Sequence, residues 1–126
     1  MFRHASVYDA YPEVRDGEQP PLRVLITRYW PRGVRGDRVD AWLKDAAPSR
    51  DLLRAYRDAS LAWDDFEARY RTEILTERPS VLDELRRLEQ QHGEVVLLCY
   101  ERLPPAEHCH RLSLLDLLTH PVRQSG

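Results

Sequence analysis

The stretch Glu94-Val95-Val96-Leu97-Leu98-Cys99-Tyr100 decides how this chain can fold. Every position from 95 to 98 is apolar, whereas a strand with one face in water alternates apolar and polar side chains. A continuous apolar run is typical of a strand that is covered on both faces, as in a parallel sheet. Parallel neighbours need a long crossover connection, so this run predicts an α/β protein with helices between its strands.

A second strand is predicted over residues 22–29, because Val24, Leu25 and Ile26 form a centre rich in strand-forming side chains. Pro31 and Gly33 follow and end it in a tight turn. A weaker alternation over residues 3–8 predicts a short first strand. We expect residues 22–29 and 94–100 to be neighbouring parallel strands joined through a right-handed crossover.

Helices are predicted between these strands and after the last one. Apolar side chains of residues 37–44 recur on one helix face. Serines that can cap a helix precede the next three helical segments. The predicted signals are Ser49, Ser60 before the stripe Trp63, Phe66, Tyr70 and Ile74, Ser80 with Asp83, Gly93 as a helix end, and Pro105 as the first residue of a last helix to about His120. Together they predict a small three-layer α/β domain over residues 1–126, with a short parallel sheet and a helical insertion between strands.

Composition excludes several classes of protein. The chain has 126 residues, 42% of them hydrophobic and 32% charged, with a formal net charge of −2. These values predict a single globular domain without the general basic character of a nucleic-acid binder. The longest apolar run, residues 95–100, is far below the roughly 20 residues of a membrane span. The N-terminus lacks the apolar core of a secretion signal, so we expect a cytoplasmic protein with no membrane partner.

The segment between Arg23 and Lys44 concentrates positive charge. It holds six basic and two acidic residues, while the remainder of the chain is acidic. Such a segment can attract an anionic ligand. It is equally consistent with a solvated loop beside acidic helices.

Two predicted strand ends bring chemically useful side chains to one edge of the sheet, where ligands of parallel sheets bind. One end is the segment Arg28–Gly33. The other carries Cys99 and Glu101 and continues to Cys109, His110 and Arg111 at the start of the last helix. A helix N-terminus lowers the pKa of a thiol, and His110 is placed to act as a base or a cationic neighbour of Cys109. Glu101 is either a general base or the salt-bridge partner of Arg111.

Each of these side chains also has a structural interpretation. Cys99 and Cys109 are expected to be reduced, because a disulfide scaffold uses more cysteines in a shorter chain. Both are also consistent with small apolar side chains packed under the sheet. Trp30 either stacks on a ligand or packs against helices. We predict no metal, because adjacent helical residues such as Cys109 and His110 point about 100° apart and no Cys-x-x-Cys pair is present.

Long strings of the chain resemble a bacterial and archaeal family, the domain of unknown function 488. The first half resembles it in Arg28-Tyr29-Trp30-Pro31-Arg32-Gly33, in residues 42–49 (Trp-Leu-Lys-Asp-Ala-Ala-Pro-Ser) and in the spacing of Trp63, Phe66 and Tyr70. The second half is similar to a branch with Leu-Leu-Cys-x-Glu and Cys-His-Arg strings, here residues 97–101 and 109–111. The Leu103-Pro104-Pro105 gap and the Arg35-Gly36-Asp37 loop depart from the family pattern. The resemblance implies a compact α/β fold and no assigned activity.

The sequence therefore predicts a site for an anionic small molecule or a nucleotide at the carboxyl ends of the strands. Arg28, Arg32 and Arg111 would bind the anion, and we expect Arg32 and Arg111 to approach each other around it. Thiol catalysis would use Cys109, in acyl or sulfur transfer, beside Cys99, Glu101 and His110. The alternative is a regulatory or interaction module that contacts nucleic acid or a protein partner through residues 28–38. Whether the protein is an enzyme, its cofactor and its oligomeric state are left open.

Overall fold

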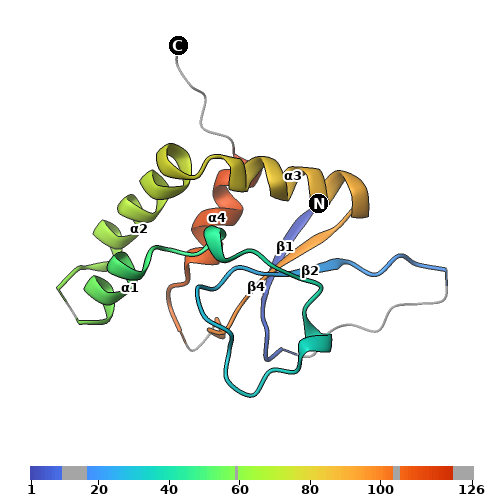
Figure 1. The fold of residues 1–126 in the computed structure, drawn as a ribbon, viewed down its shortest axis with the longest axis horizontal. Helices are drawn as coiled ribbons and strands as arrows, with labels where there is room; N and C mark the ends of the chain where they lie inside the picture. The colour runs from blue at the N-terminus through green and yellow to red at the C-terminus, as the bar shows by residue number, and fades with distance from the viewer. Residues whose placement is uncertain (10–16, 59, 104–105, 121–126) are drawn as a thin grey trace, which may run out of the picture.

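The computed structural model describes residues 1–9, 17–58, 60–103 and 106–120 of the chain. Within these residues four parallel strands form one sheet in the order β1-β4-β2-β3, of which Figure 1 labels β1, β4 and β2. They are β1 (Phe2–Ser6), β2 (Leu22–Leu25), β3 (Ala41–Trp42) and β4 (Val95–Cys99). The predicted pairing of the second and last strands is confirmed, since Leu22 lies opposite Val95 and Leu25 opposite Leu98 in a parallel register. The apolar run predicted as a doubly covered strand is the buried strand β4.

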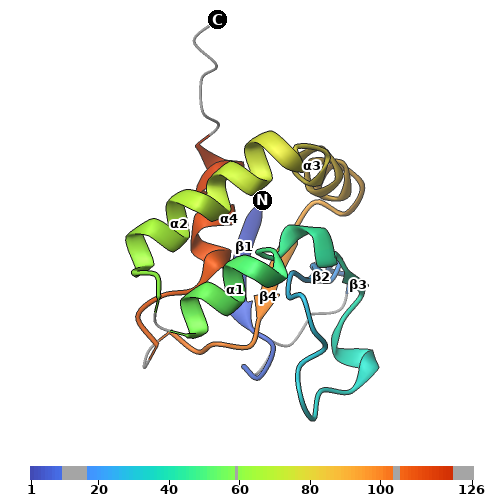
Figure 2. The ribbon, with the colours of Figure 1, turned by 60° about the vertical axis from the view of Figure 1, so that its left-hand side comes forward.

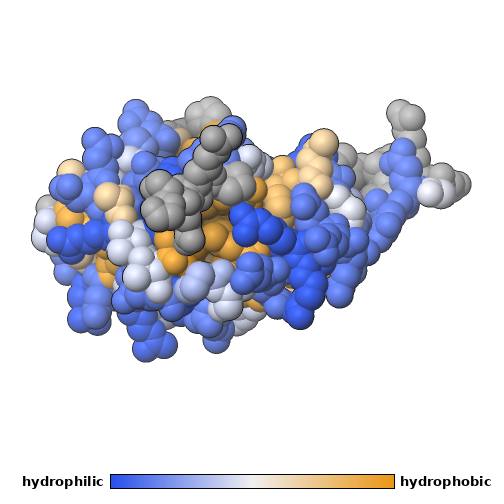
Figure 3. Space-filling model, turned by 90° about the horizontal axis from the view of Figure 1, so that it is seen from above, coloured by the Kyte–Doolittle hydropathy of each residue, from blue (hydrophilic) through white to orange (hydrophobic). Residues whose placement is uncertain are grey.

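All four α-helices pack their buried side chains into one core cluster with Val24, Leu97 and Cys99. The helices are α1 (Arg50–Arg57), α2 (Trp63–Thr72), α3 (Ser80–His92) and α4 (His110–Thr119), and a π-helical turn (Glu73–Glu77) continues α2. In Figure 2 the helices lie toward the left and the top of the view, and the connection between β2 and β3 projects at the lower right. Seen from above, the molecule is mostly hydrophilic, with apolar side chains grouped near the middle (Figure 3). The larger core lies between the helices and the sheet, since its cluster joins buried side chains of both.

The other face of the sheet is covered by an irregular segment. Its buried side chains, such as Leu25 and Leu98, form a second cluster that Val34, Val39 and Trp42 cover. The third layer of this α/β domain is therefore the connection between β2 and β3. None of the helices in the described ranges is both long and apolar enough to cross a membrane.

The predicted helix over residues 37–44 is wrong. The segment forms a 3-10 turn (Gly36–Arg38), the short strand β3, and a second 3-10 turn (Lys44–Ala46). Backbone pairing with β2 decides this, since Asp40 and Leu43 donate their N–H groups to the carbonyls of Arg23 and Leu25, each at 2.9 Å. An eight-residue helix is marginal by itself, so these bonds at the sheet edge outweigh its apolar spacing.

The capping serines behave differently from one another. The Ser49 prediction is confirmed, because its hydroxyl accepts a hydrogen bond from the Leu52 N–H at 3.2 Å at the start of α1. Ser60 does not cap α2, since its hydroxyl donates to the Ala55 carbonyl at the end of α1 (2.7 Å). Ser80 is the first residue of α3 and makes no capping bond, because Pro79 occupies the cap position. Gly93 ends α3 as predicted, with a φ of 80°.

The last helix starts later than predicted. It begins at His110, and Cys109 before it has an extended backbone with φ −154° and ψ 140°. Pro105, predicted as the first helical residue, lies outside the described residues. The delayed start moves Cys109 out of the helix, which changes where its side chain points.

The aromatic stripe of α2 is buried as the spacing predicts. Phe66 and Tyr70 are 3% and 0% exposed. Phe66 stacks on Trp63 with ring centres 5.1 Å apart, and the Tyr70 hydroxyl donates to the Ala46 carbonyl at 2.5 Å. The stripe joins α2 to the core and to the segment that leads into α1.

Candidate functional site

Cys99, Glu101, Cys109, His110 and Arg111 lie together where β4 ends and α4 begins, and we call them the thiol cluster. Cys99 is the last residue of β4, and Cys109 immediately precedes α4. The two sulfur atoms and a ring nitrogen of His110 all lie within 4.8 Å of one another. The sequence placed these five residues at one edge of the sheet, and the structure brings them into contact.

The expectation that Cys109 and His110 must diverge is wrong. It assumed helical geometry for both residues, but only His110 is helical. The extended backbone of Cys109 turns its side chain toward Cys99 and the ring of His110. Backbone conformation at one residue therefore creates the cluster.

Cys109 is surrounded by groups that favour its thiolate. Its Sγ lies 3.2 Å from Glu101 Oε2 and 3.6 Å from Nη1 of Arg111. A hydrogen bond from Cys99 lowers the pKa of Cys109 to about 3; burial opposes this shift, and the hydrogen bond and charge of His110 reinforce it. A buried thiol in apolar surroundings has the opposite shift, so Cys109 is not an ordinary packed cysteine.

Cys99 has the properties of an ordinary buried thiol. It is fully buried, and burial raises its pKa well above the usual range, reinforced by its hydrogen bond to Cys109 and by the Cys109 charge. A protonated Cys99 can donate its S–H to the Cys109 thiolate. The two cysteines thus differ in protonation although they are neighbours.

His110 carries its proton on Nε2. This nitrogen lies 2.8 Å from the carbonyl oxygen of Ile26, which can only accept a hydrogen bond, and 3.4 Å from Cys99 Sγ. Burial lowers the pKa of His110, but hydrogen bonding to Cys109 and its charge outweigh burial and raise it. The arrangement favours an imidazolium paired with the Cys109 thiolate.

Within the part of the chain that the structure describes, Cys99, Cys109 and His110 form a group that could hold a metal ion. Coordination through Nε2 of His110 would require loss of its proton and of the bond to Ile26. The present hydrogen bonding favours the ion pair over a metal site. That no metal is needed stays a prediction.

Glu101 contacts the sulfur of Cys109 and not the guanidinium of Arg111. Burial raises the pKa of the Glu101 carboxyl to about 7, and the charge of Cys109 adds to this. A protonated Glu101 can donate its O–H to the thiolate 3.2 Å away. Arg111 instead donates to the backbone carbonyl of Glu101 at 2.7 Å, so within the described residues no ion pair joins these two side chains.

Arg111 is held in place by β1. It is 2% exposed, and its Nε donates to Nδ1 of His4 at 3.1 Å. Burial, and then the charge of Arg111, lower the pKa of His4, which keeps His4 neutral and able to accept this bond. Sequence analysis did not identify His4. It becomes a candidate only once β1 is known to lie beside β4.

The other predicted anion binders do not join Arg111 by any contact among the described residues. Arg28 donates to the carbonyls of Pro48 (3.3 Å) and Ala47 (3.2 Å) and so supports the segment before α1. Arg32 is exposed, and its backbone carbonyl accepts a bond from the Tyr8 hydroxyl at 2.7 Å. That Arg32 and Arg111 meet around an anion stays a prediction.

Among the described residues, the contacts of Trp30 are with β3 and the segment before it, and not with helices as its structural interpretation predicted. Its ring meets Trp42 edge-on with centres 5.3 Å apart, and its Nε1 donates to the Val34 carbonyl at 2.9 Å. The ring is still 39% exposed. Trp30 therefore anchors the segment that covers the second face of the sheet.

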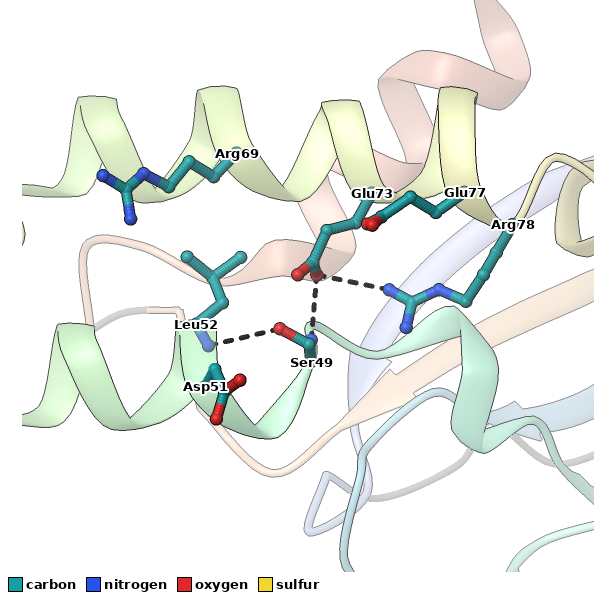
Figure 4. Close-up of a pocket in the computed structure, with 7 residues that line it drawn as sticks. All are labelled: Ser49, Asp51, Leu52, Arg69, Glu73, Glu77 and Arg78. Carbon is teal, nitrogen blue, oxygen red and sulfur yellow. Dashed lines mark hydrogen bonds and ion pairs between the residues drawn. The ribbon is translucent and has the colours of Figure 1, made fainter.

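A hollow of about 480 Å³ lies beside α1 and α2, away from any residue of the thiol cluster (Figure 4). Glu73 there accepts bonds from the Ser49 N–H (2.9 Å) and from Arg78 (3.3 Å), while Arg69 points away from them. Arg78 also donates to the Ala47 carbonyl at 3.0 Å. These contacts fix the start of α1 against α2, so the polar groups of this hollow have structural partners.

Comparisons with known proteins agree with the motifs. A family profile described as "Active DUF488-N3 subclade" matches residues 8–121. Uncharacterized protein Rv3073c of Mycobacterium tuberculosis and uncharacterized protein Mb3100c of Mycobacterium bovis are each 42% identical over 89 residues, covering 68% of this chain and 69% of theirs. Uncharacterized protein YeaO of Escherichia coli is 33% identical over 70 residues, covering 54% of this chain and 56% of its own. No solved structure matches. The chain belongs to the domain of unknown function 488 family.

Proposed function

We propose that this protein is an enzyme in which the Cys109 thiolate attacks an anionic small molecule or a nucleotide bound at the carboxyl edge of the sheet. The observation that carries the proposal is the placement of Cys109 Sγ among Glu101, His110 and Arg111, with a fully buried Cys99 beside it. Catalytic cysteines have positively charged neighbours and are partly exposed; Cys109 has the neighbours and is 2% exposed. That the matched subclade is described as active supports the same proposal.

Each residue of the thiol cluster has a role in this chemistry. Cys109 forms a covalent bond to an electrophilic carbonyl carbon or sulfur of the substrate, and the leaving group takes a proton from His110. Arg111 keeps positive charge beside the sulfur and, with Arg28 and Arg32, is proposed to bind the anion. Glu101, with a pKa of about 7, suits the proton transfers of a second step near neutral pH.

The alternative function, contact with nucleic acid or a protein through residues 28–38, has less support. Arg38 donates to the Asp9 carbonyl at 2.8 Å, and Arg35 lies 3.6 Å from Asp37. Side chains that bind their own fold have fewer donors left for phosphates. These contacts favour the thiol site as the functional centre.

Thiolate absorbance near 240 nm tests the charge of Cys109 directly. Because the pKa of Cys109 lies at about 3, wild type should show the signal of one thiolate from about pH 5 to 8, where an ordinary thiol is mostly protonated. Cys109→Ser should lose the signal. Cys99→Ala should keep it at neutral pH with a higher apparent pKa, since Cys99 supplies the largest stabilising bond. A wild-type signal that rises only above about pH 8 would contradict the proposal.

Thermal unfolding tests the anion site. Phosphate, nucleotides and small carboxylates that bind the folded wild type should raise its midpoint with concentration, by about 2.7 kcal/mol of stability at 100 times the dissociation constant. Arg32→Ala should reduce this shift. Arg35→Ala is the matched control, because Arg35 is an exposed arginine of the same segment. An equal shift in wild type and Arg32→Ala would remove Arg32 from the site.

A further inference from the structure

The two cysteines lie side by side but come from different parts of the fold. Cys109 lies before α4 among positively charged groups, and Cys99 ends β4 fully buried. Their sulfur atoms are within 4.8 Å of each other. In the proposed function Cys99 serves only as a hydrogen-bond donor to the Cys109 thiolate, but a thiol so close to a second sulfur can also take part in redox chemistry.

We propose that Cys99 is the resolving thiol of this site and closes a Cys99–Cys109 disulfide after a peroxide has oxidised Cys109. The inference rests on the proposed nucleophilic character of Cys109 and adds a redox control of the same centre. In this state the nucleophile is blocked, and a thiol reductant restores it.

The chemistry balances in two steps. The Cys109 thiolate attacks one peroxide oxygen, the O–O bond breaks, and Cys109 becomes a sulfenic acid while hydroxide leaves. Cys99 then loses its proton and attacks the Cys109 sulfur, the S–O bond breaks, and water leaves. The peroxide is reduced by two electrons, and the two thiols are oxidised to one disulfide.

Neighbouring groups supply the protons for these steps. Glu101 lies 3.2 Å from the Cys109 sulfur, close enough to protonate the departing hydroxide. Nε2 of His110 lies 3.4 Å from the Cys99 sulfur, close enough to stabilise the thiolate that forms there. Glu101 thus contacts the sulfur that reacts in the first step, and His110 contacts the sulfur that attacks in the second.

Formation of this disulfide requires the two sulfurs to move closer together. A disulfide bond is about 2.05 Å long, so the sulfurs must close from their present separation by side-chain rotation. Cys109 lies outside the α4 hydrogen-bond ladder apart from its carbonyl, which accepts from the Leu112 N–H at 3.1 Å. Its side chain can therefore turn without unwinding the helix.

Intact-mass measurement after treatment with about one equivalent of hydrogen peroxide tests the inference on full-length wild type, Cys99→Ala and Cys109→Ser. Wild type should become about 2 Da lighter, and maleimide should then label neither cysteine under denaturing conditions. Treatment with dithiothreitol should make both cysteines available to maleimide again. Cys99→Ala should instead gain about 16 Da on Cys109, the mass of one oxygen, because no thiol resolves the sulfenic acid. Cys109→Ser should keep Cys99 unmodified. Circular dichroism checks that the variants are folded, and Cys99→Ser replaces Cys99→Ala if that variant is not.

Two results would overturn the inference and leave the proposed function intact. One is a wild type that gains oxygen on Cys109 as Cys99→Ala does. The other is a disulfide between two copies of the chain, seen as a doubled mass at low protein concentration. If Cys109 resists both peroxide and iodoacetamide, the proposed nucleophile fails as well.

Discussion

Iodoacetamide should alkylate wild type at about pH 5.5 at least ~100-fold faster than it alkylates Cys109→Ser. In that variant the remaining cysteine is Cys99, which is fully buried and whose pKa burial raises. Its thiolate fraction at this pH is below about 0.1%. Peptide mapping of wild type should place the label on Cys109.

The pH profile of this reaction is more informative than its absolute rate. Wild type should react at nearly the same rate from about pH 5.5 to 8.5, whereas an ordinary thiol becomes about 500-fold more ionised over that range. A thiolate of low pKa is also a weaker nucleophile, by roughly half a logarithmic unit per pKa unit. The rate at low pH should therefore exceed that of a free thiol only several-fold, and the flat profile is the signature.

The variant Glu101→Gln separates the titration of the Glu101 carboxyl from that of the Cys109 thiol. In wild type a small inflection near pH 7 should accompany loss of the Glu101 proton, because the pKa of this carboxyl is about 7. The glutamine variant cannot titrate and should lose that inflection while the reaction stays flat elsewhere. A wild-type rate that rises tenfold per pH unit would show that Cys109 is protonated and would remove it as the nucleophile.

Sequence reasoning found the strands and the residues of the thiol cluster because both depend on local patterns. The apolar run 95–98 identifies a doubly covered strand, and polar residues that follow it must lie at the carboxyl edge of the sheet. Cys99, Glu101 and residues 109–111 were identified in this way. Parallel pairing of β2 with β4 followed from the same pattern.

The features that could not be predicted depend on contacts between distant parts of the chain. The bond from Arg111 to His4 and the one from His110 to the Ile26 carbonyl join residues more than 80 positions apart. The extended backbone of Cys109 depends on where α4 starts, which its sequence does not mark. The short strand β3 was missed for a similar reason, because its pairing with β2 outweighs a helical spacing.

Support for the thiol cluster extends through α4 to α2. Ser113 of α4 donates to Glu67 of α2 at 2.6 Å, and Arg71 of α2 pairs with Asp116 of α4 at 3.0 Å. Trp63 of α2 stacks on His108, just before Cys109, with ring centres 4.6 Å apart. The position of α2 therefore controls the helix that carries His110 and Arg111.

Phe66→Ala should consequently lower the free energy of unfolding by about 3–5 kcal/mol, because a large buried ring leaves a cavity. Phe66 is 3% exposed and packs on Trp63 and Tyr56, with ring centres 5.1 and 4.7 Å away. Typical domains are stable by roughly 5–15 kcal/mol, so this is a large share. Urea unfolding followed by tryptophan fluorescence measures the change.

Leu75→Ala is the matched control, since it also shortens an apolar side chain near α2 but at a position that is 40% exposed. This substitution should change the free energy of unfolding by no more than about 0.5 kcal/mol. A loss below about 1 kcal/mol for Phe66→Ala would show that the aromatic stripe does not hold α2 to the core. A Phe66→Ala protein that stays folded should also show a higher apparent pKa for the thiolate signal, because α2 positions the helix on which the Cys109–His110 pair depends.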